Sequence, residues 1–201
     1  MTGQSQKVRL PYGEGRQALV EAAIRLVARE GLAKLTYRSL TAEAGVSQGS
    51  LRHHFPNLVS VLEAALEHCQ EISHVRLRKP DDSLENLFVH LVDSLREHPE
   101  IPVFQTEVFL SARTRPELRE LARRHQVAYE AAVHAALEAS AVPPDEELAA
   151  AIFAMAEGIV YQRTVFGASH AEVTERQVAG SRRILAALQA SHVETSDDPQ
   201  V

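Results

Sequence analysis

Apolar residues recur every three or four positions along most of the chain, which is the spacing of one face of an α-helix. The pattern predicts helices over about 17–29, 57–79, 84–98, 103–112, 116–139, 145–166 and 171–189. Two shorter helices are expected between positions 36 and 56. No segment shows the alternation of a half-buried strand. The chain is therefore predicted to be all-α, with about nine helices: a three-helix N-terminal domain followed by a helical bundle.

The segment 36–56, TYRSLTAEAGVSQGSLRHHFP, reads as two short helices joined by a tight turn. Gly45 can adopt positive φ without a Cβ penalty, so it is expected to end the first helix and reverse the chain. Ser47 is expected to cap the second helix with its hydroxyl, and Asn57 is expected to cap the long helix that follows. Leu51 and Phe55 are spaced to anchor that helix in the core. This arrangement is typical of a helix-turn-helix motif that binds DNA.

Polar side chains occupy the outer face of the second short helix. Gln48, Ser50 and Arg52 are suited to hydrogen-bond base edges in the major groove, and Gly49 allows close backbone approach. The free N–H groups at the start of the first helix favour a phosphate oxygen. The residues predicted to bind DNA are Thr36, Tyr37, Arg38, Ser47, Gln48, Gly49, Ser50, Arg52, His53 and His54.

From Gly15 to about His68, the chain resembles the DNA-binding domain of the tetracycline-repressor (TetR) family of bacterial transcriptional regulators. The resemblance lies in the leading helix GRQALVEAAIRLVAREG, the T-x-R segment at 36–38, the run AGVSQGSLRHHFP and the long helix that follows. It implies a ligand-responsive transcriptional regulator, most simply a repressor that a small molecule releases from its DNA operator.

Two positions depart from the pattern of that family. Arg52 stands where a tyrosine is usual, and Leu58 stands where a lysine often follows the Phe-Pro step. The second departure removes a phosphate contact, for which Arg52 can substitute. An altered operator preference is therefore expected, with DNA binding retained.

Charge is distributed unevenly along the chain. Residues 1–55 contain eight Lys or Arg and four Asp or Glu, a net charge of +4. Because the whole chain has a net charge of −6, the remaining residues carry −10. The basic charge lies on the predicted DNA-binding domain. The low overall pI of about 5.9 therefore argues only weakly against nucleic-acid binding, because the local field matters more than the sum.

A cytoplasmic location is expected from the single cysteine, Cys69, and from the lack of an apolar signal or spanning segment. The predicted domains are a flexible arm at 1–14, a helix-turn-helix domain at 15–60, a ligand-binding and dimerisation domain at 61–192, and a flexible tail at 193–201. The basic residues Lys7 and Arg9 in the arm are more simply solvated than bound to DNA.

The middle helices are expected to enclose a pocket for a small-molecule effector. Most of the candidate residues are apolar and are individually more typical of plain core. Glu107 is the exception, because it can orient a cationic or hydroxylated ligand or serve as a structural carboxylate. The predicted ligand-binding residues are Phe88, Leu91, Phe104, Glu107, Val108, Tyr129 and Met155.

The last two helices carry small and apolar residues on one face, which either pack within the subunit or form a dimer interface. The resemblance favours the interface, because members of the family usually dimerise through a four-helix bundle made by these helices. The predicted interface residues are Ala154, Gly158, Tyr161, Val165, Ile184 and Leu188. A homodimer would suit a palindromic operator with half-sites about 34–36 Å apart.

Other functions are weaker interpretations of the sequence. His68, Cys69 and His74 share a helix, but their spacing does not form a closed ligand set, so no metal or cofactor is expected. An all-α enzyme would need a reactive group such as Glu107 or His134, and no catalytic motif accompanies either. A helix-turn-helix that docks protein instead of DNA is the remaining alternative, and weak dependence on salt would identify it.

Overall fold

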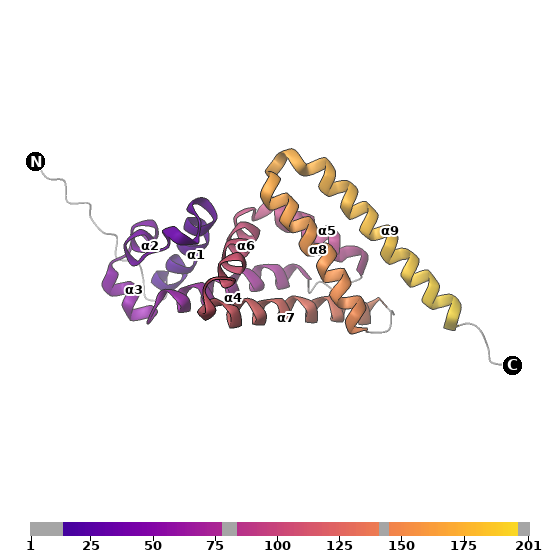
Figure 1. Cartoon of the computed structure of the whole chain (residues 1–201), viewed down its shortest axis with the longest axis horizontal. Helices are drawn as coiled ribbons and strands as arrows, with labels where there is room; N and C mark the ends of the chain where they lie inside the picture. The colour runs from indigo at the N-terminus through magenta and orange to yellow at the C-terminus, as the bar shows by residue number, and fades with distance from the viewer. Residues whose placement is uncertain (1–13, 78–83, 141–144, 197–201) are drawn as a thin grey trace, which may run out of the picture. The chain divides into compact units, whose positions relative to one another are not determined.

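The computed structural model describes residues 14–77, 84–140 and 145–196, and every regular element in these ranges is helical. This confirms the predicted all-α class. The helices, α1 to α9, are labelled in Figure 1. They are grouped into two compact units. The N-terminal unit contains the described residues up to 70 together with 103–122, and the C-terminal unit contains 71–102 and the residues from 123 onward.

The N-terminal unit is built on three helices that pack against one another: α1 (Glu14–Glu30), α2 (Tyr37–Ala44) and α3 (Gln48–His54). A short 3-10 helix, η1 (Leu32–Lys34), connects α1 to α2. Leu19 in α1, Leu40 in α2 and Leu51 in α3 are fully buried. These side chains supply the hydrophobic contacts that hold the three short helices together.

Gly45 ends α2 in the left-handed conformation, with φ 68° and ψ 18°. Its backbone N–H donates to Ala42 O, and Val46 N donates to Thr41 O at 3.1 Å. Ser47 caps α3, because its Oγ accepts a hydrogen bond from Ser50 N at 3.1 Å. The predicted glycine turn and serine cap are therefore both present.

Helix α4 (Leu58–Leu77) follows the helix-turn-helix and continues into the C-terminal unit. Asn57 caps it as predicted, with Oδ1 accepting from Ser60 N at 2.9 Å. Helix α6 (Glu100–Ala112) and the start of α7 (Pro116–Ala139) complete the N-terminal unit from residue 103 to residue 122. This grouping differs from the single expected boundary after residue 60.

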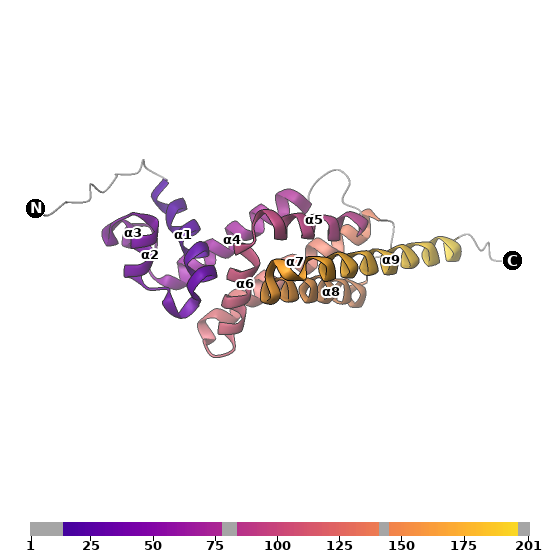
Figure 2. The same cartoon turned by 90° about the horizontal axis from the view of Figure 1, so that it is seen from above.

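The C-terminal unit contains α5 (Leu84–Glu97), the remainder of α7, α8 (Glu146–Phe166), η2 (Gly167–His170) and α9 (Ala171–Ser196). Helices α8 and α9 form a hairpin through η2, as both views show (Figures 1 and 2). Its core is a cluster of buried apolar residues from α5, α7, α8 and α9: Phe88, Val133, Ala136, Leu137, Ala149, Ile152, Ile159 and Leu185. No helix of the described ranges is long and apolar enough to cross a membrane.

Two helix ends differ from the expectation. Helix α6 begins at Glu100, three residues before the expected start at 103, and so includes Pro102. Proline is tolerated there because the N–H groups of a helix's first turn have no partner within the helix. Helix α9 continues to Ser196, past the expected tail boundary at 193, because no glycine or proline stops it before Pro199. Residues 1–13 of the predicted arm lie outside the described residues, and Glu14 begins α1.

Candidate functional site

The outer face of α3 is open to solvent. Gln48, Gly49, Arg52 and His53 are exposed, and Ser50 is partly exposed. On the opposite side of the helix, Leu51 is fully buried and the C-cap residue Phe55 is 3% exposed. Burial of one side fixes the helix and leaves a row of hydrogen-bonding side chains on the other, which is the geometry that a recognition helix requires.

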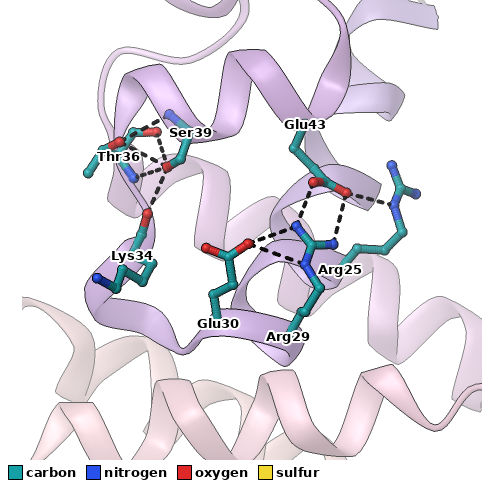
Figure 3. A network of polar contacts seen from close by, with 7 residues as sticks. All are labelled: Arg25, Arg29, Glu30, Lys34, Thr36, Ser39 and Glu43. Carbon is teal, nitrogen blue, oxygen red and sulfur yellow. Dashed lines mark hydrogen bonds and ion pairs between the residues drawn. The ribbon is translucent and has the colours of Figure 1, made fainter.

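The start of α2 is held by reciprocal hydrogen bonds between Thr36 and Ser39 (Figure 3). Ser39 N donates to Thr36 Oγ1 at 3.1 Å, and Thr36 N donates to Ser39 Oγ at 2.9 Å. Ser39 Oγ also donates to Lys34 O at 2.7 Å, which ties α2 to η1. The Thr36 side chain therefore serves the helix cap, while Arg38 is exposed on the first turn and Tyr37 is half-buried.

An ion-pair network joins α1 to α2 beside this cap (Figure 3). Arg29 Nη2 lies 2.7 Å from Glu43 Oε2 and 3.0 Å from Glu30 Oε1, and Arg25 Nε lies 3.5 Å from Glu43 Oε1. The hydrogen bond from Arg29 lowers the pKa of Glu43 below its ordinary value of 4.5. A carboxyl pKa that is lower in the folded than in the unfolded state stabilises the fold at pH values above the unfolded-state pKa. This contribution is lost as the pH falls through the folded-state pKa. The network thus helps fix α2 at neutral pH.

His54 is less exposed than its neighbour His53, although the centroids of the two rings are 5.2 Å apart. It is half-buried against the start of α1, where a Cβ added to Gly15 would lie 3.1 Å from its Nε2 atom. The structure thus gives His54 a packing role between α3 and α1.

Arg16 was missed by the sequence analysis. Its guanidinium carbon lies 5.3 Å from the centroid of the Phe55 ring, at the C-terminal end of α3, and the side chain is exposed. This cation–π contact holds a positive charge next to the recognition helix. The order of residues in α1 gives no signal for it, because 39 residues separate the two partners.

The seven predicted ligand-binding residues are divided between the two units. Phe104 and Val108 are fully buried in the N-terminal unit. Glu107, beside them on α6, accepts a hydrogen bond from the backbone N–H of Leu32 at 3.1 Å, so it serves as a structural carboxylate there. In the C-terminal unit, Phe88 belongs to the buried core, and Leu91 and Met155 pack against the same cluster.

Aromatic and acidic groups meet where α7 packs near α8. The Tyr129 and Phe153 rings are 6.5 Å apart between centroids. Phe153 and Glu157 are four positions apart on α8 and so share a face. Partial desolvation and then repulsion by Glu130 raise the pKa of Glu157. Glu130 and Glu157 therefore lie near enough in the C-terminal unit for their charges to repel each other.

The predicted dimer residues lie mostly on exposed faces. Ala154 and Gly158 are exposed, and Tyr161, Val165 and Ile184 are each 53% exposed. Five residues of α8 follow one another at intervals of three or four positions and form one continuous stripe: Ala151, Ala154, Gly158, Tyr161 and Val165. Leu188 differs, because it packs against the core of its own subunit. Tyr161, Val165 and Ile184 are large apolar side chains left in solvent, as at a protein interface.

Two family models match the chain. One, described as "Tetracyclin repressor-like, C-terminal domain", covers residues 79–199, and the other, described as "Bacterial regulatory proteins, tetR family", covers residues 19–65. The chain belongs to the TetR family. It is therefore a ligand-responsive transcriptional regulator of the TetR family that binds DNA through its helix-turn-helix.

Solved structures agree with this assignment. A putative TetR-family transcriptional regulator from Rhodococcus sp. is 21% identical, with a TM-score of 0.74 over 89% of this chain and 100% of that chain. A TetR-family member from Streptomyces coelicolor A3 is 28% identical, with a TM-score of 0.68 over 87% and 98%. The multidrug binding protein EbrR, complexed with ethidium, is 28% identical, with a TM-score of 0.64 over 87% and 98%. None of the curated proteins compared matches significantly.

Proposed function

We propose that this TetR-family protein is a homodimeric repressor, without enzymatic activity, that a small molecule releases from a palindromic operator. The observation that carries the proposal is the exposed polar face of α3, fixed from behind by Leu51 and Phe55. Two such faces in a symmetric dimer would enter successive major grooves, about 34–36 Å apart. The exposed stripe on α8, together with Ile184 on α9, is the proposed dimer surface.

The proposed DNA contacts fall into two classes. Gln48 and Arg52 project from the exposed face of α3 and are assigned to base edges. Arg38 on the first turn of α2 and Arg16 at the C-terminal end of α3 are assigned to phosphates, because both are exposed cations of the three-helix domain. His54 is left out of the contact set because it packs against Gly15.

Replacing Arg38 by alanine is expected to weaken binding to all duplex DNA to a similar extent. The loss of one phosphate contact from each subunit, two per dimer, should reduce the slope of log K against log salt by about 2. Fluorescence anisotropy with the operator and with an unrelated duplex, at several salt concentrations, measures both effects. An unchanged slope would remove Arg38 from the contacts, and salt-insensitive binding by the wild type would favour the protein-docking alternative.

Release would follow a shift in conformational population. Helix α4 runs from the helix-turn-helix into the C-terminal unit, so a ligand that favours one orientation of α4 would alter the separation of the two recognition helices. Thermodynamic linkage then requires operator DNA to weaken ligand binding by the same factor.

The effector is proposed to be a planar organic cation. Support comes from the raised pKa of Glu157 beside Glu130, since a bound cation would relieve the repulsion between the two carboxylates, and from the neighbouring rings of Tyr129 and Phe153. EbrR, the 28% identical relative, is described in complexes with ethidium and with proflavin.

Ethidium is accordingly expected to bind the DNA-free protein, and Glu157→Gln is expected to weaken it about 5- to 10-fold through loss of one charge contact. Ethidium fluorescence polarisation without DNA measures this directly. Glu146→Gln, an exposed carboxylate on the first turn of the same helix, is the matched control and should bind as the wild type does. Equal affinity of all three proteins would argue against the carboxylate pair as the effector site.

A further inference from the structure

Helix α6 belongs to the C-terminal domain by sequence family but to the N-terminal unit by packing. The C-terminal family model covers it, since that model spans residues 79–199, yet from Val103 onward α6 packs as part of the compact unit that contains the helix-turn-helix. Both ends of the segment 103–122 continue along the chain into the C-terminal unit. Helix α6 from Val103 onward therefore belongs to the unit that carries α3 and is joined to the C-terminal unit by the chain alone.

Glu107 forms a long-range hydrogen bond between α6 and the turn after α1. Its Oε2 atom accepts from the backbone N–H of Leu32 at 3.1 Å, across 75 positions of sequence. Leu32 opens η1, whose N-cap residue Gly31 makes no side-chain cap. The first N–H groups of a helix lack intrahelical partners, so Glu107 supplies from a distant helix the acceptor that a local cap would provide.

Gly31 forms the turn that precedes Leu32. Its φ is +83°, a conformation that side-chain-bearing residues rarely adopt. Glu107 Oε2 would lie in ordinary van der Waals contact, at 3.4 Å, with a Cβ at this position. The turn conformation is therefore the reason for a glycine here.

The turn that Glu107 holds leads into the helix-turn-helix. Lys34, at the end of η1, accepts through its carbonyl the hydrogen bond from Ser39 Oγ in α2. Helix α2 in turn packs against α3. A continuous set of hydrogen bonds and packing contacts thus runs from α6 through η1 and α2 to the recognition helix.

We propose that Glu107 is a positioning residue that couples α6 to the recognition helix through its hydrogen bond to Leu32. The inference rests on the proposed repressor function, because it assigns the route by which a change in the C-terminal unit reaches the DNA-binding face. It gives the chain a second connection beside α4, in which Glu107 supplies the hydrogen bond to the turn after α1.

Hydrogen-exchange mass spectrometry on the full chain tests the coupling, with and without a duplex selected by the wild-type protein from random DNA. In the wild type, DNA is expected to slow exchange both at Leu32 and in the α6 peptide 100–112. Glu107→Ala should speed Leu32 exchange about tenfold without DNA, because its N–H loses its acceptor. The same variant should lose the DNA-dependent protection of α6 and bind the duplex about 5- to 30-fold more weakly.

Two further variants separate coupling from general damage. Glu107→Gln keeps an acceptor oxygen without the charge, so its Leu32 exchange should lie between wild type and Glu107→Ala, with α6 still protected by DNA. Glu117→Ala removes an exposed carboxylate from the first turn of α7, in the same unit, and should match the wild type throughout. If the alanine variant does not fold, the glutamine variant decides: Leu32 exchange faster than in the wild type supports the coupling, and exchange equal to that of the wild type overturns it.

The outcomes distinguish the coupling from the function on which it rests. A wild-type protein that selects no DNA would contradict the repressor proposal, while faster Leu32 exchange in DNA-free Glu107→Ala would still support the hydrogen bond. A wild-type protein that binds DNA, combined with equal α6 protection in Glu107→Ala, would overturn the coupling and leave the repressor proposal intact.

Discussion

Val165→Asp is expected to convert the dimer into monomers and to reduce affinity for a palindromic operator at least about 100-fold. Val165 is 53% exposed in the single chain and lies on the α8 stripe with Tyr161 and Gly158. In a two-fold symmetric interface the same patch is buried on both subunits, so one substitution places two unpaired carboxylates in the desolvated surface. Each half-site would then be bound without the help of the other.

Sedimentation velocity gives the oligomeric state, and anisotropy on duplexes with one or two half-sites gives the affinity. The matched control is Val127→Asp, because Val127 is a 49% exposed valine on α7 outside the stripe. It should remain a dimer and bind like the wild type. A Val165→Asp protein that stays dimeric would show that the exposed stripe is not the interface.

Arg52→Ala should have the second-largest effect, a loss of about 1–3 kcal/mol on the preferred operator with a much smaller loss on unrelated DNA. Arg52 is exposed on α3, in the row that also contains Gln48 and Gly49. A bidentate arginine contact to a guanine discriminates among base pairs, whereas a phosphate contact does not. Gln48→Ala should act in the same direction and relax specificity at a different base pair.

Competition between the preferred operator and single-base variants, measured by anisotropy, resolves these two effects. Arg113→Ala removes an exposed arginine of the N-terminal unit away from α3 and serves as the control. Equal losses on all sequences would reassign Arg52 to the phosphates. That result would also fit the departure from the family pattern at this position and at Leu58.

The local features of the helix-turn-helix could be predicted from sequence because each depends on neighbouring residues. Gly45 carries its conformational preference wherever it stands, and Ser47 and Asn57 cap helices through N–H groups three positions ahead. The exposed face of α3 followed from the burial of Leu51 and Phe55. Such signals act over one or two helical turns.

The features that were missed depend on partners far apart in the chain. The Glu107–Leu32 hydrogen bond spans 75 positions, so the sequence left Glu107 open between a ligand contact and a structural group. The Arg16–Phe55 contact also needs the angle between α1 and α3, which tertiary packing sets. The inclusion of 103–122 in the N-terminal unit has the same cause.

The central claim is that the exposed face of α3 enters the major groove in two half-sites of one operator. DNA cleavage by an iron chelate attached to α3 tests it most directly. Cys69 is the only cysteine and is fully buried, so a cysteine placed at the exposed position 53 can be labelled selectively with the chelate. With the His53→Cys conjugate, strand cleavage is predicted at two places about one helical turn, ~34–36 Å, apart, at the edges of the major groove. Bound DNA with no cleavage beyond that of the treated wild-type protein would contradict the account.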